Sequence, residues 1–157
     1  MDEHSYLQKV QECERSLYRV SRSILWNDAD CADAVQQAVF KGWVNLSQLN
    51  EPEKFKSWIM SILVNECRNI QRRNLRHANV VQALADRIKT ASPTKIHNTD
   101  LEEAVRALPE HYRLPILLHY MEGYPVKDIA KILEVNEKRI TERMYRARRK
   151  LEEALKL

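Results

Sequence analysis

Glycine and cysteine are scarce in this sequence, and their scarcity excludes several classes of protein. Of 157 residues, two are glycine and three are cysteine. A glycine-rich loop that wraps a phosphate group is therefore absent. Cys13, Cys31 and Cys67 are an odd number of widely spaced residues without a Cys-x-x-Cys pair. They predict neither a zinc site nor a disulfide framework, and we expect a reducing compartment.

Patterns for catalysis, metal binding and membrane insertion are also lacking. No nucleophile with a partner base and no carboxylate pair can be recognised, and the five histidines have no ligand spacing. We therefore expect no enzymatic activity, no metal and no other cofactor. The N-terminus lacks the basic and then apolar pattern of a signal peptide, and no apolar run approaches the length of a membrane span. These absences predict a cytoplasmic protein.

What the sequence does contain is typical of an all-α protein. Ala, Leu, Glu, Lys and Arg are abundant, and no run of alternating β-branched residues indicates a strand. We expect a first helical domain over residues 1–76, whose third helix begins at Phe55 and fades at 72–74. A flexible, partly helical linker over 77–99 and a second helical domain over 100–157 are expected to follow.

The second domain contains the pattern of a helix-turn-helix. Four apolar residues line one face of residues 126–133, and four more line one face of the following helix. Residues 134–136 have the length of the tight connection that joins two such helices. These apolar positions are Val126, Ile129, Ala130 and Leu133, then Ile140, Met144, Ala147 and Leu151.

Positive charge gathers on the last helix. Residues 138–150 hold seven Lys and Arg against one acid, Glu142, in a chain of net charge +4. A helix with one apolar seam and basic residues elsewhere suits a partner covered in phosphates. Glu142 has two interpretations, because it either reads a cytosine amino group or pairs with Lys138, Arg139 or Arg146. Both remain open at this point.

Several motifs occur in the order and spacing of a known family. The chain resembles the extracytoplasmic-function sigma factors, the small promoter-recognition subunits of bacterial RNA polymerase. One departure concerns the helix-turn-helix, where Glu134 replaces the usual glycine and predicts a reshaped turn. Gln37 and Val39 replace a usual acid and a usual Phe. The matching segments are 30–43, 55–59, 65–69, Leu108-Pro109 with Arg113, 120–124, Ile129-Ala130 and 143–148.

The resemblance implies a sigma factor that binds core RNA polymerase and directs transcription initiation by recognising −35 and −10 promoter elements and assisting melting. It implies −35 recognition by Lys138, Arg139, Thr141, Glu142, Arg143, Arg146 and Arg149. It implies −10 recognition and melting by Asn50, Lys56, Asn65, Arg68, Asn69, Arg72 and Arg73. It implies polymerase binding by Asp33, Gln36, Gln37, Phe40 and Lys41.

The implied partners are the clamp and flap regions of core polymerase, promoter DNA and, as in other members, an anti-sigma factor. Three aromatic residues are expected in the core, because Trp43 lies among apolar helix positions and Phe55 and Trp58 are spaced i and i+3. The alternative function is a free-standing helix-turn-helix regulator that binds duplex DNA without polymerase. An N-terminal half with a ligand pocket or a symmetric dimer seam would favour that alternative.

Overall fold

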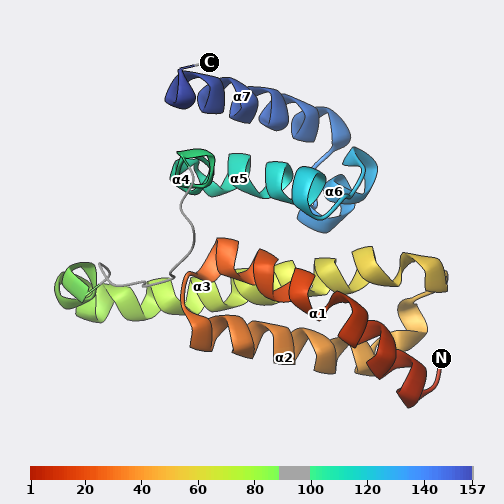
Figure 1. Ribbon diagram of the computed structural model, residues 1–157. Coiled ribbons are helices and arrows are strands. Elements are labelled where there is room, and N and C mark those ends of the chain that lie inside the picture. The colour runs from red at the N-terminus through yellow and green to blue at the C-terminus, as the bar shows by residue number, and fades with distance from the viewer. Residues whose placement is uncertain (89–99, 157) are drawn as a thin grey trace.

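The computed structural model describes residues 1–88 and 100–156. For residues 78–88 it describes the backbone only. Within these residues every regular element is helical. Figure 1 shows α1, α2 and α3 side by side, with α4 to α7 stacked on the α1 and α3 side and α2 farthest from them. The all-α fold predicted from the sequence is confirmed.

The first half is a bundle of three helices. α1 (Glu3–Leu25) and α2 (Asp28–Val44) are joined by a short turn, in which the Asn27 side chain accepts a hydrogen bond from the Asp30 amide at 3.0 Å. Asn is favoured at helix N-termini, because its side-chain oxygen can accept from an amide of the first turn. Two 3-10 turns, η1 (Leu46–Gln48) and η2 (Pro52–Lys54), connect α2 to α3. The buried core of this bundle includes Leu17, Ile59 and Leu63.

The third helix is longer than predicted. α3 runs without a break from Phe55 to Ile88, so the expectation that it fades at 72–74 was wrong. Polar residues such as Arg72, Arg73 and Asn74 are good or neutral helix formers when exposed, and a run of them need not end a helix. The proposed linker begins inside this helix, and its C-terminal part, 89–99, lies outside the described residues.

The described part of the second half, 100–156, contains four α-helices. They are α4 (Asp100–Ala107), α5 (Glu110–Ile116), α6 (Val126–Leu133) and α7 (Glu137–Leu155). A π-helical turn, η3 (Leu117–Met121), extends α5, and Gly123 follows at a φ of 78°. Its left-handed backbone suits glycine, which has no Cβ to clash. Pro109 and Pro125 immediately precede α5 and α6.

The two halves are packed against each other. α5 contacts α1, and α6 contacts α3. The Arg113 guanidinium is buried where it crosses from α5 to the Ser23 carbonyl at the end of α1. The two helical domains predicted from the sequence are therefore in direct contact in this state of the chain. Each half alone would bury limited apolar surface, and the contact between them enlarges what is buried.

Candidate nucleic-acid interface

α6 and α7 form the predicted helix-turn-helix. Ile129, Ala130 and Leu133 of α6 are buried, as are Ile140 and Met144 of α7. The Asn136 side chain accepts a hydrogen bond from the Arg139 amide at 2.8 Å and caps α7. The apolar seam read from the sequence is thus the face that packs inward, and the basic residues are left on the outer face.

The residues implied in −35 recognition share this outer face. Glu142 is exposed and makes no ion pair within the described part of the chain, so of its two interpretations the pairing with Lys138, Arg139 or Arg146 is not found. The Thr141 hydroxyl donates to the Glu137 carbonyl at 3.0 Å, and Arg149 donates to the Tyr145 hydroxyl at 3.2 Å. Arg143 is half-buried. The exposed members are Lys138, Arg139, Thr141, Glu142, Arg146 and Arg149.

The turn between the two helices keeps a left-handed residue although glycine is missing. Glu134 has φ 57° and ψ 45°, and it ends α6. The prediction of a reshaped turn is therefore wrong. The buried residues on both sides of the turn, Leu133 and Ile140, hold the helices in place and impose this conformation. A left-handed conformation in a residue with a Cβ costs about 1 kcal/mol.

The residues implied in −10 recognition lie along α3 and in the connection before it. Asn50, Asn65 and Asn69 are exposed, and Arg68 is half-buried. Arg72 donates to the side chain of Asn69. Asn50, Asn65, Asn69 and Arg72 are thus exposed to solvent, and Arg68 is partly exposed.

Two of the implied −10 residues are already engaged by other groups. Arg73 lies 3.8 Å from an Asp30 oxygen and 3.7 Å from an Asp33 oxygen. Lys56 donates to the Glu122 carbonyl at 3.3 Å. Both side chains remain exposed, so each cation keeps donors that face solvent.

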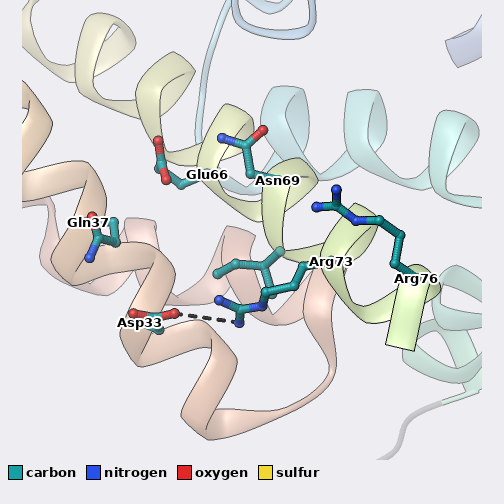
Figure 2. A pocket seen from close by; sticks show the side chains of 7 residues that line it. Asp33, Gln37, Glu66, Asn69, Arg73 and Arg76 are labelled. Atoms are coloured by element: carbon teal, nitrogen blue, oxygen red, sulfur yellow. Dashed lines mark ion pairs between the residues drawn. The ribbon is translucent and has the colours of Figure 1, made fainter. Parts of the chain in front are cut away.

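A polar cleft of about 340 Å³ opens between α2 and α3. In Figure 2, Arg73 of α3 points toward Asp33 of α2, with Arg76 one turn further along α3. The cleft therefore brings together residues that the sequence assigned to polymerase and residues that it assigned to DNA. The lining residues are Asp33, Gln37, Glu66, Asn69, Ile70, Arg73 and Arg76.

The outer face of α2 carries large apolar side chains. Phe40 is 64% exposed, Val44 is 61% exposed and Trp43 is 42% exposed. The expectation that Trp43 is mostly buried was wrong. Its ring lies at the rim of the core, with its centroid 5.3 Å from that of buried Tyr6. Phe55 is buried and Trp58 is half-buried, so both are core residues, as predicted.

The remaining residues implied in polymerase binding lie near this apolar face. Gln36 and Gln37 are exposed, and Asp33 is half-buried beside Arg73. Lys41 forms an ion pair with Glu66 of α3 at 2.5 Å. α2 thus combines polar groups with an unusually apolar outer surface.

Sequence reasoning missed the residues between the two halves. Arg19 of α1 binds Glu122, whose side chain is 1% exposed. Tyr124 is buried and donates to the Lys56 carbonyl at 3.3 Å, and burial raises the pKa of Tyr124 above its usual value. Burial also lowers the pKa of Arg113. The one signal in the sequence was that Arg113 and Glu122 are motif residues without an assigned role.

Comparison with protein families matches both halves. The first model, sigma-70 region 2, covers residues 10–77, and the second, sigma-70 region 4, covers residues 98–151. The sigma factor SigV of Bacillus subtilis is 27% identical over 138 residues, which are 88% of this chain and 83% of that protein. The extracytoplasmic-function sigma factor SigM of Mycobacterium tuberculosis is 28% identical over 152 residues, covering 96% of this chain and 76% of that protein.

The fold also matches solved structures. The sigma factor RpoE of Bartonella quintana, solved with the anti-sigma factor NepR, aligns with a TM-score of 0.80 at 22% identity over 98% of both chains. CnrH, solved with the cytosolic domain of CnrY, aligns with a TM-score of 0.70 at 22% identity, over 99% of this chain and 90% of that chain. With both of its halves matched in their proper order, the chain belongs to the sigma-70 family of RNA polymerase sigma factors, in the extracytoplasmic-function group.

Proposed function

We propose that the two halves divide the work of promoter recognition, with α7 reading the −35 element and α3 with the preceding connection meeting the −10 element. The observation that carries this division is the outer face of α7, where exposed cations surround one unpaired acid. Such a helix can enter the major groove, with some side chains on phosphates and others on base edges. As a sigma factor, the protein directs core polymerase to promoters.

The −10 half of the proposal rests on exposed amides and guanidinium groups along α3. Opening a duplex requires positive charge that holds one strand and groups that accept an unstacked base. Asn65 and Asn69 lie on the same helix as Arg68 and Arg72, one turn apart, and the exposed members can contact a strand without moving the core. Asn50 adds a polar group from the connection between α2 and α3.

Polymerase docking is proposed for α2. Phe40, Trp43 and Val44 expose a continuous apolar strip on the helix that carries Gln36 and Gln37. Exposed large apolar residues in one patch mark protein interfaces more often than chance. We place this docking on the clamp of the polymerase, and a second contact of the C-terminal half on the flap.

The experiment combines the protein, core polymerase and a promoter selected from genomic fragments by the resulting holoenzyme. Arg143→Ala is expected to abolish or relax use of the upstream element, because Arg143 lies at the edge of the reading face. Arg72→Ala is expected to slow strand opening more than initial binding. Footprinting reports the first effect and permanganate reactivity reports the second. The reverse pattern would show that the roles assigned to the two halves must be exchanged. Binding to DNA without any association with polymerase would refute the proposal.

An inhibitory partner and a place of action complete the proposal. RpoE, which shares this fold, was solved with the anti-sigma factor NepR, and we propose that this chain also has an anti-sigma partner. Across the described residues, no helix has the length and apolar character needed to cross a membrane. We place its action in the cytoplasm, where polymerase and promoter DNA lie. Affinity purification of the tagged chain from its native cell tests for the inhibitor, and recovery of polymerase alone would argue against one.

A further inference from the structure

A hollow of about 520 Å³ lies on the surface of α1, outside the residues implied in promoter or polymerase binding. Within the described residues, its whole lining comes from this one helix. Three lining residues are exposed arginines, and the half-buried ring of Tyr18 lies among them. The lining therefore holds three guanidinium groups and one carboxylate around a single aromatic ring. We name it the α1 groove, and its residues are Glu14, Arg15, Tyr18, Arg19 and Arg22.

The spacing of these residues places them on one face of the helix. Arg15, Tyr18 and Arg22 are three and then four residues apart, the interval at which helix side chains lie above one another. Exposed Gln11, four residues before Arg15, continues the same row. This spacing usually marks an apolar seam that packs inward, but the buried seam of α1 runs elsewhere, through Leu17. Packing of the core therefore does not account for the arginines of the groove.

Positive charge along α1 is concentrated at the groove. Residues 15–27 hold three Arg and no Asp or Glu. Arg22 lies 3.8 Å from Asp28, whose side chain is 84% exposed, and such an exposed pair contributes little. Arg22 also suits the last turn of α1, where a cation offsets the helix dipole.

Arg15 has no such structural role. It lies two turns before Arg22, where the effect of the helix dipole has faded. It is exposed, and it makes no ion pair in the part of the chain that the structure describes. Arg19, in contrast, is already bound to the Glu122 carboxylate. Arg15 and Arg22 are therefore the two guanidinium groups of the groove that can bind an external anion.

Guanidinium groups beside an aromatic ring fit a single strand of nucleic acid. Guanidinium groups bind phosphates through paired N–H donors, and an aromatic ring stacks on an unpaired base of any sequence. The Arg22 guanidinium carbon lies 5.9 Å from the centre of the Tyr18 ring, so the two kinds of contact are neighbours. Arg15 and Arg22 are about 10 Å apart along the axis at about 1.5 Å per residue. This span is about three phosphate intervals at about 3.4 Å along a stacked strand.

Other ligands that carry phosphate fit the groove less well. A small ligand is usually bound in a pocket that buries most of its surface, and a hollow lined by one helix has no opposing wall. The bases of a duplex are paired and stacked, so their flat faces do not reach the Tyr18 ring. A strand that is separated from its complement offers both phosphates and open base faces.

We propose, on the basis of the function proposed above, that the α1 groove is a further nucleic-acid site that holds a strand released by promoter melting. Arg15 and Arg22 bind its phosphates, and Tyr18 stacks on one of its bases. Arg19 stays on Glu122 and is not needed. The groove thus adds a third contact with promoter DNA, beside those proposed for α7 and α3, and this contact forms only after the strands separate.

The test compares single-stranded and duplex binding by the full chain. The ligand is a mixed-sequence 20-nucleotide strand, alone or annealed to its complement, and fluorescence anisotropy measures its affinity over a series of salt concentrations. The double variant Arg15→Gln/Arg22→Gln is expected to bind the single strand at least about tenfold more weakly at low salt. Its slope of log affinity against log salt is expected to be smaller by about 1.4, because each lost phosphate contact removes about 0.7. Its affinity for the duplex is expected to stay close to that of wild type.

A matched pair of single variants separates the groove from charge in general. Arg15→Gln is expected to reduce the salt slope by about 0.7. Lys9→Gln is the control, because it also removes one positive charge from α1, but from another face, where the ammonium lies 5.9 Å from the centre of the Phe55 ring. It is expected to leave both the slope and the affinity close to those of wild type.

A second pair of variants tests the aromatic ring. Tyr18→Leu keeps an apolar side chain against the core and removes the flat face. It is expected to weaken single-strand binding by about fivefold or more, through the loss of one stacked base, without a change in the salt slope. Tyr18→Phe keeps the ring and is expected to bind like wild type.

Equal single-strand affinities of Arg15→Gln and Lys9→Gln would overturn the proposal. An equal loss of single-strand and duplex binding by the double variant would also overturn it, because that loss would be a general effect of charge. So would displacement of the strand by poly-glutamate as effectively as by unlabelled strand, which would make the groove a site for an acidic protein. These measurements use neither promoter nor polymerase. A failure of the groove is therefore distinct from a failure of promoter recognition, which the transcription assay reports.

Discussion

At the scale of single residues, the structure turns several ambiguous sequence features into definite chemical environments. Glu134 keeps the left-handed conformation that glycine usually fills, and Glu142 stands on a basic helix without an ion pair in the described chain. The sequence marked Glu134 as a departure from the family and left Glu142 with two interpretations, but it showed the environment of neither. Whether a charged side chain finds a partner depends on rotamers and on neighbouring helices, which spacing along the chain does not specify.

Glu134→Gly is expected to stabilise the protein by about 1 kcal/mol, because it removes the steric cost of a Cβ at φ 57°. Urea unfolding measures the change. Lys131→Gly, at an exposed position within α6, serves as control and is expected to destabilise by about 1 kcal/mol through loss of helix propensity. If both variants lose stability equally, the turn is not strained.

Glu142→Gln is expected to change sequence preference at one base pair of the upstream element. A carboxylate accepts from the cytosine amino group, and such a contact is worth about 1–3 kcal/mol of discrimination. Selection of randomised duplexes by the holoenzyme gives the preference of each variant. Glu152→Gln removes an acid from the exposed end of α7 as the matched control. Uniformly tighter binding to all sequences by Glu142→Gln would mean that the acid only repels phosphates.

At the scale of elements, close packing decides what hydrophobic periodicity leaves open. The apolar faces of α6 and α7 were predicted correctly, because the apolar face of an amphipathic helix packs against the core. The length of α3 and the exposure of Trp43 were not, because each depends on how far neighbouring helices extend. α2 illustrates both outcomes: its inner face is tightly packed, and its outer face exposes Phe40.

Gly42→Ala is expected to destabilise the protein by about 1–3 kcal/mol, although alanine is the better helix former. A Cβ at Gly42 would lie 2.5 Å from the Tyr6 hydroxyl oxygen and 2.7 Å from Cδ1 of Ile59. The Tyr6 hydroxyl donates to the Val39 carbonyl at 2.5 Å and is not free to move aside. Thermal unfolding measures the loss, with Ala32→Gly, at an exposed position of α2, reporting propensity alone. A gain in stability for Gly42→Ala would show that the side chains of Tyr6 and Ile59 can move to accommodate the added methyl group.

Phe40→Ala is expected to leave the free energy of unfolding unchanged within about 0.5 kcal/mol, because the side chain is 64% exposed. It is expected to weaken binding to core polymerase by at least about tenfold, because truncating an aromatic residue at the centre of an interface costs about 2 kcal/mol or more. Surface plasmon resonance with immobilised core enzyme measures the affinity. Leu75→Ala, at a 66% exposed residue of α3, is the control. Equal affinities for the two variants would show that the apolar strip on α2 is not part of the surface that binds polymerase.

At the scale of the whole molecule, buried titratable groups connect stability to pH. Burial raises the pKa of Cys67 to about 12, of Cys13 to about 11 and of the Tyr6 hydroxyl to about 12. Each raised pKa means that the folded state holds its proton after the unfolded chain has lost its own. The stability that these groups contribute is fully present below the ordinary pKa and declines as pH rises toward the folded value.

The free energy of unfolding is therefore expected to be flat near pH 7–8 and to fall above pH 9, at about 1.4 kcal/mol per pH unit for each buried thiol. Urea unfolding at pH 8 and pH 10 measures the decline. Cys67→Ala is expected to show a shallower decline than wild type, whatever its stability at pH 8. An identical decline in the two proteins would show that the Cys67 thiol does not titrate with unfolding.

The sequence by itself determined the all-α class, the helix-turn-helix, its basic outer face and the family, because these depend on local periodicity, composition and motif spacing along the chain. Only the tertiary structure decided that α3 continues to Ile88, that Trp43 is exposed and that the two halves close on one another. Glu122 lies 103 positions from Arg19, and no local pattern joins them. Contacts between residues so far apart arise from the packing of whole helices, in which each buried charge needs a partner that only the folded chain can supply.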